Sequence, residues 1–263
     1  MEQAGYFSVS GAHLYTVLHA VPNPIARVLL VGPFASQRHS GYIPWVRWAR
    51  YLATRQIECL RYDYRGVGES TGNFADMSFG TWSEDVQILA CWLKTRSPGV
   101  PLMLHGLDMG ALFAAQNFQV GIGDALLLWA PPASANESLR TTIARQIGLE
   151  KLFRYVGAKQ RQASDYIRQL DDGLLIEIDG YEWSSRLWHD SFDLHLPPGI
   201  GDESGDTLAS ERPVRIVWPE NAAPLIKGSS VAYDTINKDF TQLFSQNYDW
   251  LSMVTATLIG QHS

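Results

Sequence analysis

One pentapeptide in this 263-residue chain has the residue types and the spacing of a catalytic turn. The segment Gly106–Gly110 (Gly-Leu-Asp-Met-Gly) follows the largely apolar run Pro101–His105. Two glycines placed two positions either side of a central residue are typical of a nucleophile elbow, where a buried strand turns sharply into a helix and exposes one side chain. The central residue here is Asp108, in place of the usual serine or cysteine. A carboxylate at this position cannot perform serine chemistry.

Two interpretations of Asp108 remain open at this point. As a nucleophile, it would attack an sp³ carbon and form an alkyl-enzyme ester that water then hydrolyses. Attack on an ester carbonyl would instead give a mixed anhydride, so Asp108 does not replace serine in an esterase. Alternatively, the central residue of an elbow usually has a positive φ, which Asp tolerates better than most residues. An elbow that has lost catalysis would then keep Asp108 for its backbone alone.

The surrounding sequence predicts the elements that position this turn. Strand-like and helix-like patterns alternate, which favours an α/β fold with a mostly parallel central sheet and helices on both faces. We expect an antiparallel hairpin at the start (Tyr6–Val9 and Leu14–His19), followed by five buried strands at Arg27–Val31, Ile57–Tyr62, Leu102–His105, Ala125–Trp129 and Val214–Trp218. Helical spacing of apolar residues predicts helices at Trp45–Arg55, Thr81–Thr95 and from Met109 to about Phe118.

This order of elements, with its motifs, resembles the α/β-hydrolase superfamily. An Asp-x-Arg-Gly-x-Gly-x-Ser turn at Asp63–Ser70 and the elbow occur together at the separation that the superfamily shows. Within it, the chain is most similar to hydrolase-like proteins found with exosortase and exopolysaccharide gene sets, through the segments Gly32–Ser36, Leu126–Pro131 and Glu177–Glu182. The resemblance implies the α/β-hydrolase fold, and a setting in surface-polysaccharide or similar biosynthesis.

The pattern changes after Pro132, where helical segments rich in charged residues begin. We therefore expect residues 134–196 to form a cap inserted into an α/β-hydrolase core made of residues 1–133 and 197–263. Within the cap, Leu174–Ile178 has the pattern of a strand and Trp183–Leu194 that of a helix. The polar stretch 197–212 is expected to be a surface loop.

The resemblance also implies roles for particular residues. An oxyanion hole in this fold uses the backbone N–H after the nucleophile and one from the loop after the third strand, here Met109 and Phe34. The acid would follow the penultimate strand, where Glu220 is the candidate. The base would lie between the last strand and the final helix.

No histidine occupies that expected position. We expect the last strand at Asp239–Phe244 and the final helix at Leu251–Gly260, and the loop Ser245–Trp250 between them contains no histidine. His39, in the loop after the third strand, is the candidate base, with His189 and His195 of the cap as further possibilities. His105 is expected to be a core residue. Because a triad works as a unit, loss of its base removes most of its activity.

Composition excludes several other classes of function. A net charge of −6 argues against a nucleic-acid surface, and no apolar stretch approaches membrane-spanning length. Cys59 and Cys91 are expected to be reduced core residues of a cytoplasmic protein. Histidines and cysteines do not cluster at metal-ligand spacings, and we expect no cofactor. The start of the chain lacks the features of a signal peptide.

The sequence therefore predicts an α/β-hydrolase-fold protein with a degenerate triad, which binds a small-molecule or acyl ligand or serves as an accessory protein. The alternative is an active hydrolase or acyl-transfer enzyme that uses Asp108 as nucleophile or acid/base with a cap or loop histidine. Substrate, ligand and oligomeric state are left open.

Overall fold

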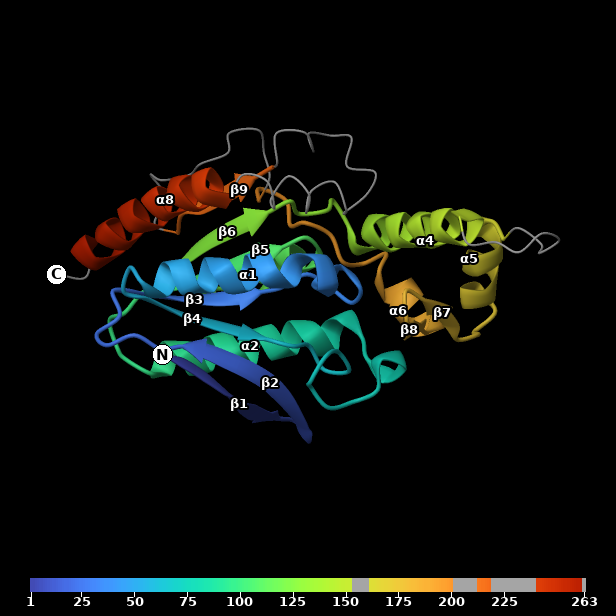
Figure 1. The fold of residues 1–263 in the computed structure, drawn as a ribbon, viewed down its shortest axis with the longest axis horizontal. Helices are drawn as coiled ribbons and strands as arrows, with labels where there is room; N and C mark the ends of the chain where they lie inside the picture. Colours follow the sequence, from blue (N-terminus) through green and yellow to red (C-terminus); the bar gives the residue numbers. More distant parts are fainter. Residues whose placement is uncertain (153–160, 201–211, 219–239, 262–263) are drawn as a thin grey trace.

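The computed structural model describes residues 1–152, 161–200, 212–218 and 240–261 (Figure 1). Seven of its described strands form the central sheet in the order β1-β2-β4-β3-β5-β6-β9. Their bounds are β1 Glu2–Val9, β2 Ala12–His19, β3 Ala26–Val31, β4 Ile57–Tyr62, β5 Leu102–Leu107, β6 Ala125–Trp129 and β9 Val214–Val217. The five strands predicted to lie side by side do so, and β3, β4, β5, β6 and β9 pair in parallel. The predicted mostly parallel sheet is confirmed.

The predicted hairpin at the start of the chain is also confirmed. Strands β1 and β2 pair antiparallel from Glu2 opposite His19 to Val9 opposite Ala12. Ser10 and Gly11 turn the chain with positive φ angles of 40° and 80°, which glycine adopts at no steric cost. Strand β2 then pairs antiparallel with β4, so the hairpin extends one edge of the parallel sheet.

Helices cover both faces of the sheet (Figure 1). On one face, α1 (Gln37–Ala53) and α8 (Phe240–Gln261) pack in one hydrophobic cluster with alternate residues of the strands. On the other face, α2 (Phe79–Thr95) and α3 (Met109–Gln119) pack in a second cluster. Strands β3, β5 and β6 are buried along their whole length, since both faces are covered.

Helix α8 corrects the expected end of the chain. The predicted strand Asp239–Phe244 and loop Ser245–Trp250 are wrong, because residues 240–261 form one helix. The helical spacing of Phe244, Trp250, Leu251, Val254 and Leu258, all buried in the cluster beside α1, explains the difference. A short apolar run does not by itself distinguish a strand from a buried helix.

The helices and strands described within residues 134–196 lie beyond the carboxyl ends of the parallel strands (Figure 1). We call residues 134–196 the insert. Its elements are α4 (Ala135–Leu152), α5 (Ala163–Asp171), the paired strands β7 (Ile176–Ile178) and β8 (Tyr181–Trp183), and α6 (Ser185–Asp190). Strand β7 begins two residues later than the predicted strand Leu174–Ile178. Trp183 belongs to β8 rather than to the helix that follows it. Much of the stretch 197–212 lies outside the described residues.

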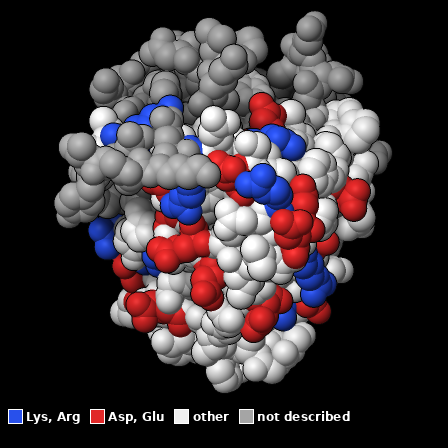
Figure 2. Space-filling model, turned by 90° about the vertical axis from the view of Figure 1, so that its right-hand side faces the viewer, with Lys and Arg blue, Asp and Glu red and all other residues white. Residues whose placement is uncertain are grey.

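Seen from the side of the insert, acidic and basic side chains are interspersed over the described surface (Figure 2). Among the described residues, no helix is both long and apolar enough to cross a membrane. Both cysteines are free, but only Cys59 is buried. The prediction that Cys91 is a core residue is wrong, because its position on α2 faces away from the sheet.

Candidate functional site

The elbow has the conformation that its sequence predicts. Strand β5 ends at Leu107 and α3 begins at Met109, so that Asp108 alone makes the turn. Its φ of 53° and ψ of −129° lie in a region that few non-glycine residues adopt. The Asp108 N–H donates to the carbonyl of Trp129 at 3.0 Å, and its carbonyl accepts from the Ala111 N–H at 2.9 Å. The turn is therefore held on both sides by backbone hydrogen bonds.

The two flanking glycines are required by close backbone approaches. A Cβ on Gly106 would lie 2.7 Å from the backbone nitrogen of Ala111 and closer still to its Cα. A Cβ on Gly110 would lie 2.9 Å from the carbonyl carbon of Val31 and closer still to the carbonyl oxygens of Val31 and Gly32. Backbone atoms in a packed sheet cannot move far enough to admit either one. Helix α3 consequently packs directly against the end of β3.

The loop after β3 runs beside the elbow, as the proposed oxyanion hole requires. We call residues 32–36 the β3 loop. The Tyr64 hydroxyl donates to the Gly32 carbonyl at 2.7 Å, and the Gln37 N–H donates to the Phe34 carbonyl at 3.1 Å. Phe34 and Met109 are each 1% exposed as whole residues. Their side chains are therefore buried and unavailable to a ligand.

Aromatic packing anchors Phe34 in the core. Its ring lies 4.7 Å from that of Trp82, 5.7 Å from Phe74 and 5.9 Å from Phe79, centroid to centroid. Edge and tilted contacts of this kind stabilise beyond simple area burial. The β3 loop is thus fixed by packing at Phe34 and by hydrogen bonding at Gly32.

The Tyr64 phenol is hydrogen-bonded to the β3 loop and is also influenced by the charge of Asp108. Burial raises the pKa of the Tyr64 phenol far above its usual range, and the negative charges of Asp108 and Asp85 raise it further. The phenol therefore stays protonated and remains the hydrogen-bond donor to Gly32. Sequence reasoning gave Tyr64 no role, although it lies inside the Asp63–Ser70 motif.

Asp63 in the same motif organises a turn. It accepts two hydrogen bonds from the Arg38 guanidinium, at 3.0 and 2.8 Å, and one from the Glu69 N–H at 3.0 Å. Its carbonyl accepts from the Ser70 hydroxyl at 2.6 Å. These bonds satisfy the carboxylate, so we assign Asp63 a structural role.

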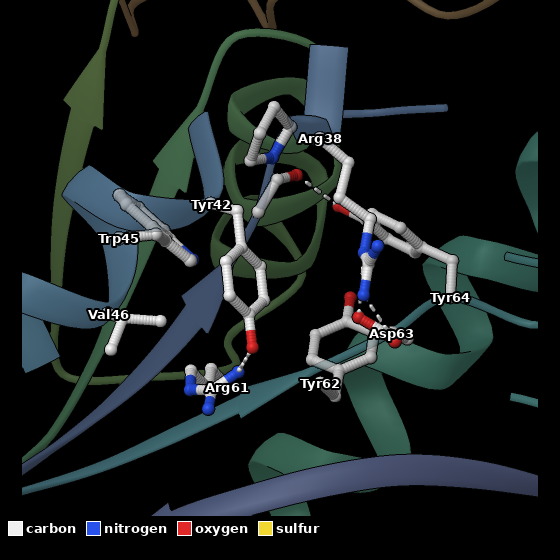
Figure 3. A pocket seen from close by; sticks show the side chains of 10 residues that line it. Arg38, Tyr42, Trp45, Val46, Arg61, Tyr62, Asp63 and Tyr64 are labelled. Carbon is white, nitrogen blue, oxygen red and sulfur yellow. Dashed lines mark hydrogen bonds and ion pairs between the residues drawn. The ribbon is translucent and has the colours of Figure 1, made fainter. Parts of the chain in front are cut away.

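A cavity of about 30 Å³ lies behind the β3 loop (Figure 3). Arg38, Tyr42 and Trp45 of α1 line it on one side and Arg61 of β4 on another. Its volume suits one or two water molecules and is far below that of a site for an organic ligand. A larger open groove of about 510 Å³ lies between the start of α2 and α6.

The candidate histidines have contacts elsewhere. His39 is exposed in the first turn of α1 rather than in a loop, with its Nδ1 3.2 Å from the Ser36 carbonyl. His189 lies 3.9 Å from the Asp171 carboxylate. The Nε2 of His195, which is exposed, lies 2.6 Å from the Phe192 carbonyl. These described contacts do not bring any of the three to the elbow.

His105 is a core residue, as predicted. Its Nδ1 accepts a hydrogen bond from the Trp48 indole at 3.0 Å, and its ring lies edge-on to Trp129 at 4.5 Å. Burial lowers its pKa well below the usual value, so the imidazole is neutral. It lies in the cluster beside α1, on the face of the sheet opposite α3.

The candidate acid Glu220 lies outside the described residues. The sequence itself holds no histidine between residues 196 and 261. The expected last strand and loop are part of helix α8. This correction does not change the prediction that the segment before the final helix contains no histidine. Among the described residues, no group of three His, Cys, Asp or Glu side chains is placed to hold a metal ion.

Comparison with known proteins agrees with this architecture. The family model described as serine aminopeptidase, S33, matches residues 39–168, a range that includes the elbow. The structure is similar to that of the α/β hydrolase GrgF from Penicillium sp. sh18, with a TM-score of 0.61 and 16% identity over 97% of this chain and 99% of that one. It is also similar to Est1E from Butyrivibrio proteoclasticus, solved with ferulic acid bound, with a TM-score of 0.56 and 15% identity over 90% and 100% of the two chains.

A more partial match is the serine hydrolase XC6422 from Xanthomonas campestris, at 21% identity and a TM-score of 0.43. It covers 50% of this chain and 62% of that one, so the chain spans less than two thirds of that relative. Comparison with curated proteins gives no match. The chain has the α/β-hydrolase fold, and the family model together with the structural neighbours supports its place in the α/β-hydrolase superfamily.

Proposed function

We propose that this protein is an α/β-hydrolase-fold protein with a degenerate triad, which binds a ligand or serves as an accessory protein without hydrolysing esters. The observation that carries the proposal is Asp108, which is 8% exposed and held at a φ of 53° in the elbow. A carboxylate there does not perform serine chemistry, and residues 196–261 supply no histidine.

The ligand that fits this proposal is neutral and carries an acyl carbonyl. The backbone N–H groups of Phe34 and Met109 are the proposed donors to its carbonyl oxygen. The Asp108 carboxylate beside them disfavours an anionic ligand by like-charge repulsion. Residues 134–196 are proposed to form the cap over this site, inserted in a core of residues 1–133 and 197–263.

The biological setting is proposed from resemblance alone. The segments Gly32–Ser36, Leu126–Pro131 and Glu177–Glu182 resemble hydrolase-like proteins found with exosortase and exopolysaccharide gene sets. We therefore propose a role in surface-polysaccharide or similar biosynthesis. A cytoplasmic location is proposed with it, supported by the free thiols of Cys59 and Cys91.

Binding without turnover is tested with p-nitrobutyranilide, a neutral acyl amide that resists spontaneous hydrolysis. Saturable binding should raise the melting temperature as the anilide concentration rises, since a ligand stabilises the state that it binds. No nitroaniline should be released. Absence of binding would contradict the ligand-binding proposal, and catalysed release would favour the active enzyme with Asp108 as acid/base.

A further inference from the structure

Three side chains from distant parts of the chain meet where the insert touches the β3 loop. They are Ser36 of the β3 loop, Arg145 of α4 and Asp179 of the turn between β7 and β8. The Ser36 hydroxyl donates to Asp179 Oδ2 at 2.9 Å. The Arg145 guanidinium donates to the Ser36 hydroxyl at 2.8 Å and forms an ion pair with Asp179. We call these three residues the latch.

The latch uses the Ser36 hydroxyl both as a donor and as an acceptor. A hydroxyl has one proton to donate and lone pairs to accept, so Ser36 can bond both members of the ion pair at once. The Arg145 and Asp179 side chains are 29% and 11% exposed. Partial burial weakens the screening of their attraction by water compared with a fully exposed pair.

Two further contacts hold the same junction. The Gln37 side chain donates to the Thr142 hydroxyl at 3.1 Å in a buried position, one helical turn before Arg145 on α4. On the other side, the ring of Tyr181 in β8 lies 4.7 Å from Phe74, which packs against Phe34. The insert therefore contacts the carboxyl end of the β3 loop, and Tyr181 of the insert packs against the aromatic cluster that surrounds Phe34.

Ser36 lies close in sequence to the proposed donor, the Phe34 N–H, so contacts at Ser36 affect the position of that group. Ser36 follows Phe34 by two residues, a span of at most about 7 Å, with Ala35 between them at a φ of 46°. A single alanine at positive φ is strained and persists only where its surroundings hold it. The packing of the Phe34 ring holds one side of this strained residue, and the direction of the Phe34 N–H also depends on what holds Ser36 on the other side.

We propose that Arg145 and Asp179 are positioning residues, which act through Ser36 to fix the β3 loop. The Phe34 N–H is presented to a ligand only while the insert is docked on the core. The proposal rests on the proposed function in taking that N–H as a donor to an acyl ligand. Ligand binding and docking of the insert are then coupled in both directions.

Hydrogen–deuterium exchange of the free protein tests the latch without any ligand. Arg145→Ala, Asp179→Asn and the milder Ser36→Ala should each speed exchange in the peptide covering residues 32–37 by about tenfold, because the loop opens locally more often. Exchange in residues 102–107 of β5 should not change, and the melting temperature should fall by less than about 4 °C. Combining Arg145→Ala with Asp179→Asn should add little to either alone, because both remove the same interaction.

Arg168→Ala is the matched control. Arg168 also lies in the insert and pairs with Asp165 at 3.0 Å, but its side chain is 70% exposed and the pair does not reach the core. It should leave exchange in residues 32–37 unchanged. The same pattern in the control and the latch variants would overturn the proposal.

Binding of p-nitrobutyranilide separates the two proposals. The latch variants should bind it at least about fivefold more weakly than the parent, within the usual range of coupling between sites. Unchanged exchange in residues 32–37, or equally faster exchange throughout the molecule, would overturn the latch. Faster exchange confined to the loop, in a protein whose parent form binds no anilide, would support the latch and overturn the proposed function.

Discussion

The two ends of the chain contribute very differently to the carboxyl edge of the sheet. From the first half come the β3 loop, the Asp63–Ser70 turn and the elbow, which contact one another through the Tyr64–Gly32 hydrogen bond and the close approach of Gly110 to β3. From the second half, α8 contributes hydrophobic packing beside α1, and the sequence supplies no histidine after residue 195 until His262.

This difference separates what the fold needs from what catalysis needs. An elbow with two glycines and a residue at positive φ is a packing requirement, because α3 must pass close to β3 and β5. An acid and a base at the far end of the sheet serve chemistry alone. The chain satisfies the first requirement fully, and we propose that it no longer meets the second.

The largest effect should come from filling the space at the elbow. Gly106→Ala places a Cβ against the backbone of Ala111, and the strand and helix cannot separate without disrupting the sheet. We expect a loss of more than about 4 kcal/mol in the free energy of unfolding, measured by urea denaturation. The soluble yield should fall accordingly.

Gly148→Ala is the control for this change. Gly148 lies inside α4 with nothing near the position of an added Cβ, so alanine there should be neutral or stabilise by up to about 1 kcal/mol. A Gly106→Ala protein as stable as the parent would show that the elbow is not closely packed. It would contradict the conclusion that the elbow glycines are a packing requirement of the fold.

A second test asks whether the buried His19 and His105 are neutral in the folded protein and so make its stability depend on pH. Burial, and secondarily the charge of Arg61, lower the pKa of His19 to about 4. The unfolded chain therefore binds this proton from about pH 6.5 downward while the folded protein does not. The free energy of unfolding should be highest above pH 6.5 and should decrease as the pH is lowered. His19 should account for about 2–3 kcal/mol of this decrease at pH 4.5.

Urea denaturation at pH 7.0 and 4.5 measures this effect. His19→Gln should reduce the difference between the two pH values, and His189→Gln should not, because His189 is more than half exposed. The neutral His105 should maintain part of the dependence in both variants. An unaltered pH dependence in His19→Gln would contradict the burial of His19 as a neutral imidazole in the folded protein.

A third test addresses the backbone at the centre of the elbow. Asp108→Val puts a β-branched side chain at a φ of 53° and should lower the free energy of unfolding by about 1–3 kcal/mol. Asp108→Asn is the control, because Asn tolerates positive φ nearly as well as Asp. It should unfold within about 0.5 kcal/mol of the parent. Equal losses in both variants would show that the carboxylate is needed for more than its backbone conformation.

Much of the fold is predictable because its signals are local. The strands β3, β5 and β6 are largely apolar runs, since the sheet is covered on both faces. The positive φ of Asp108 follows from the elbow motif, a buried strand followed by the two spaced glycines. Local pattern was not enough for α8, whose first residues also suit a strand and whose helical state is fixed by contacts with α1.

The latch shows what local signals omit. Glu177–Glu182 stands out in the sequence only by resemblance, with no partner indicated. Its contact with Ser36 joins residues 143 positions apart, and α4 supplies Arg145 from a third segment. Only the packing of the insert on the core brings these side chains together.

The proposal that the elbow has kept its backbone and lost its chemistry is tested most directly by ester turnover. The parent and Asp108→Ala are assayed with p-nitrophenyl acetate and p-nitrophenyl butyrate at neutral pH. We predict that both release p-nitrophenolate at the same slow rate, because the residue at the elbow performs no chemistry. Saturable release by the parent that disappears in Asp108→Ala would contradict this account and identify the protein as an active enzyme.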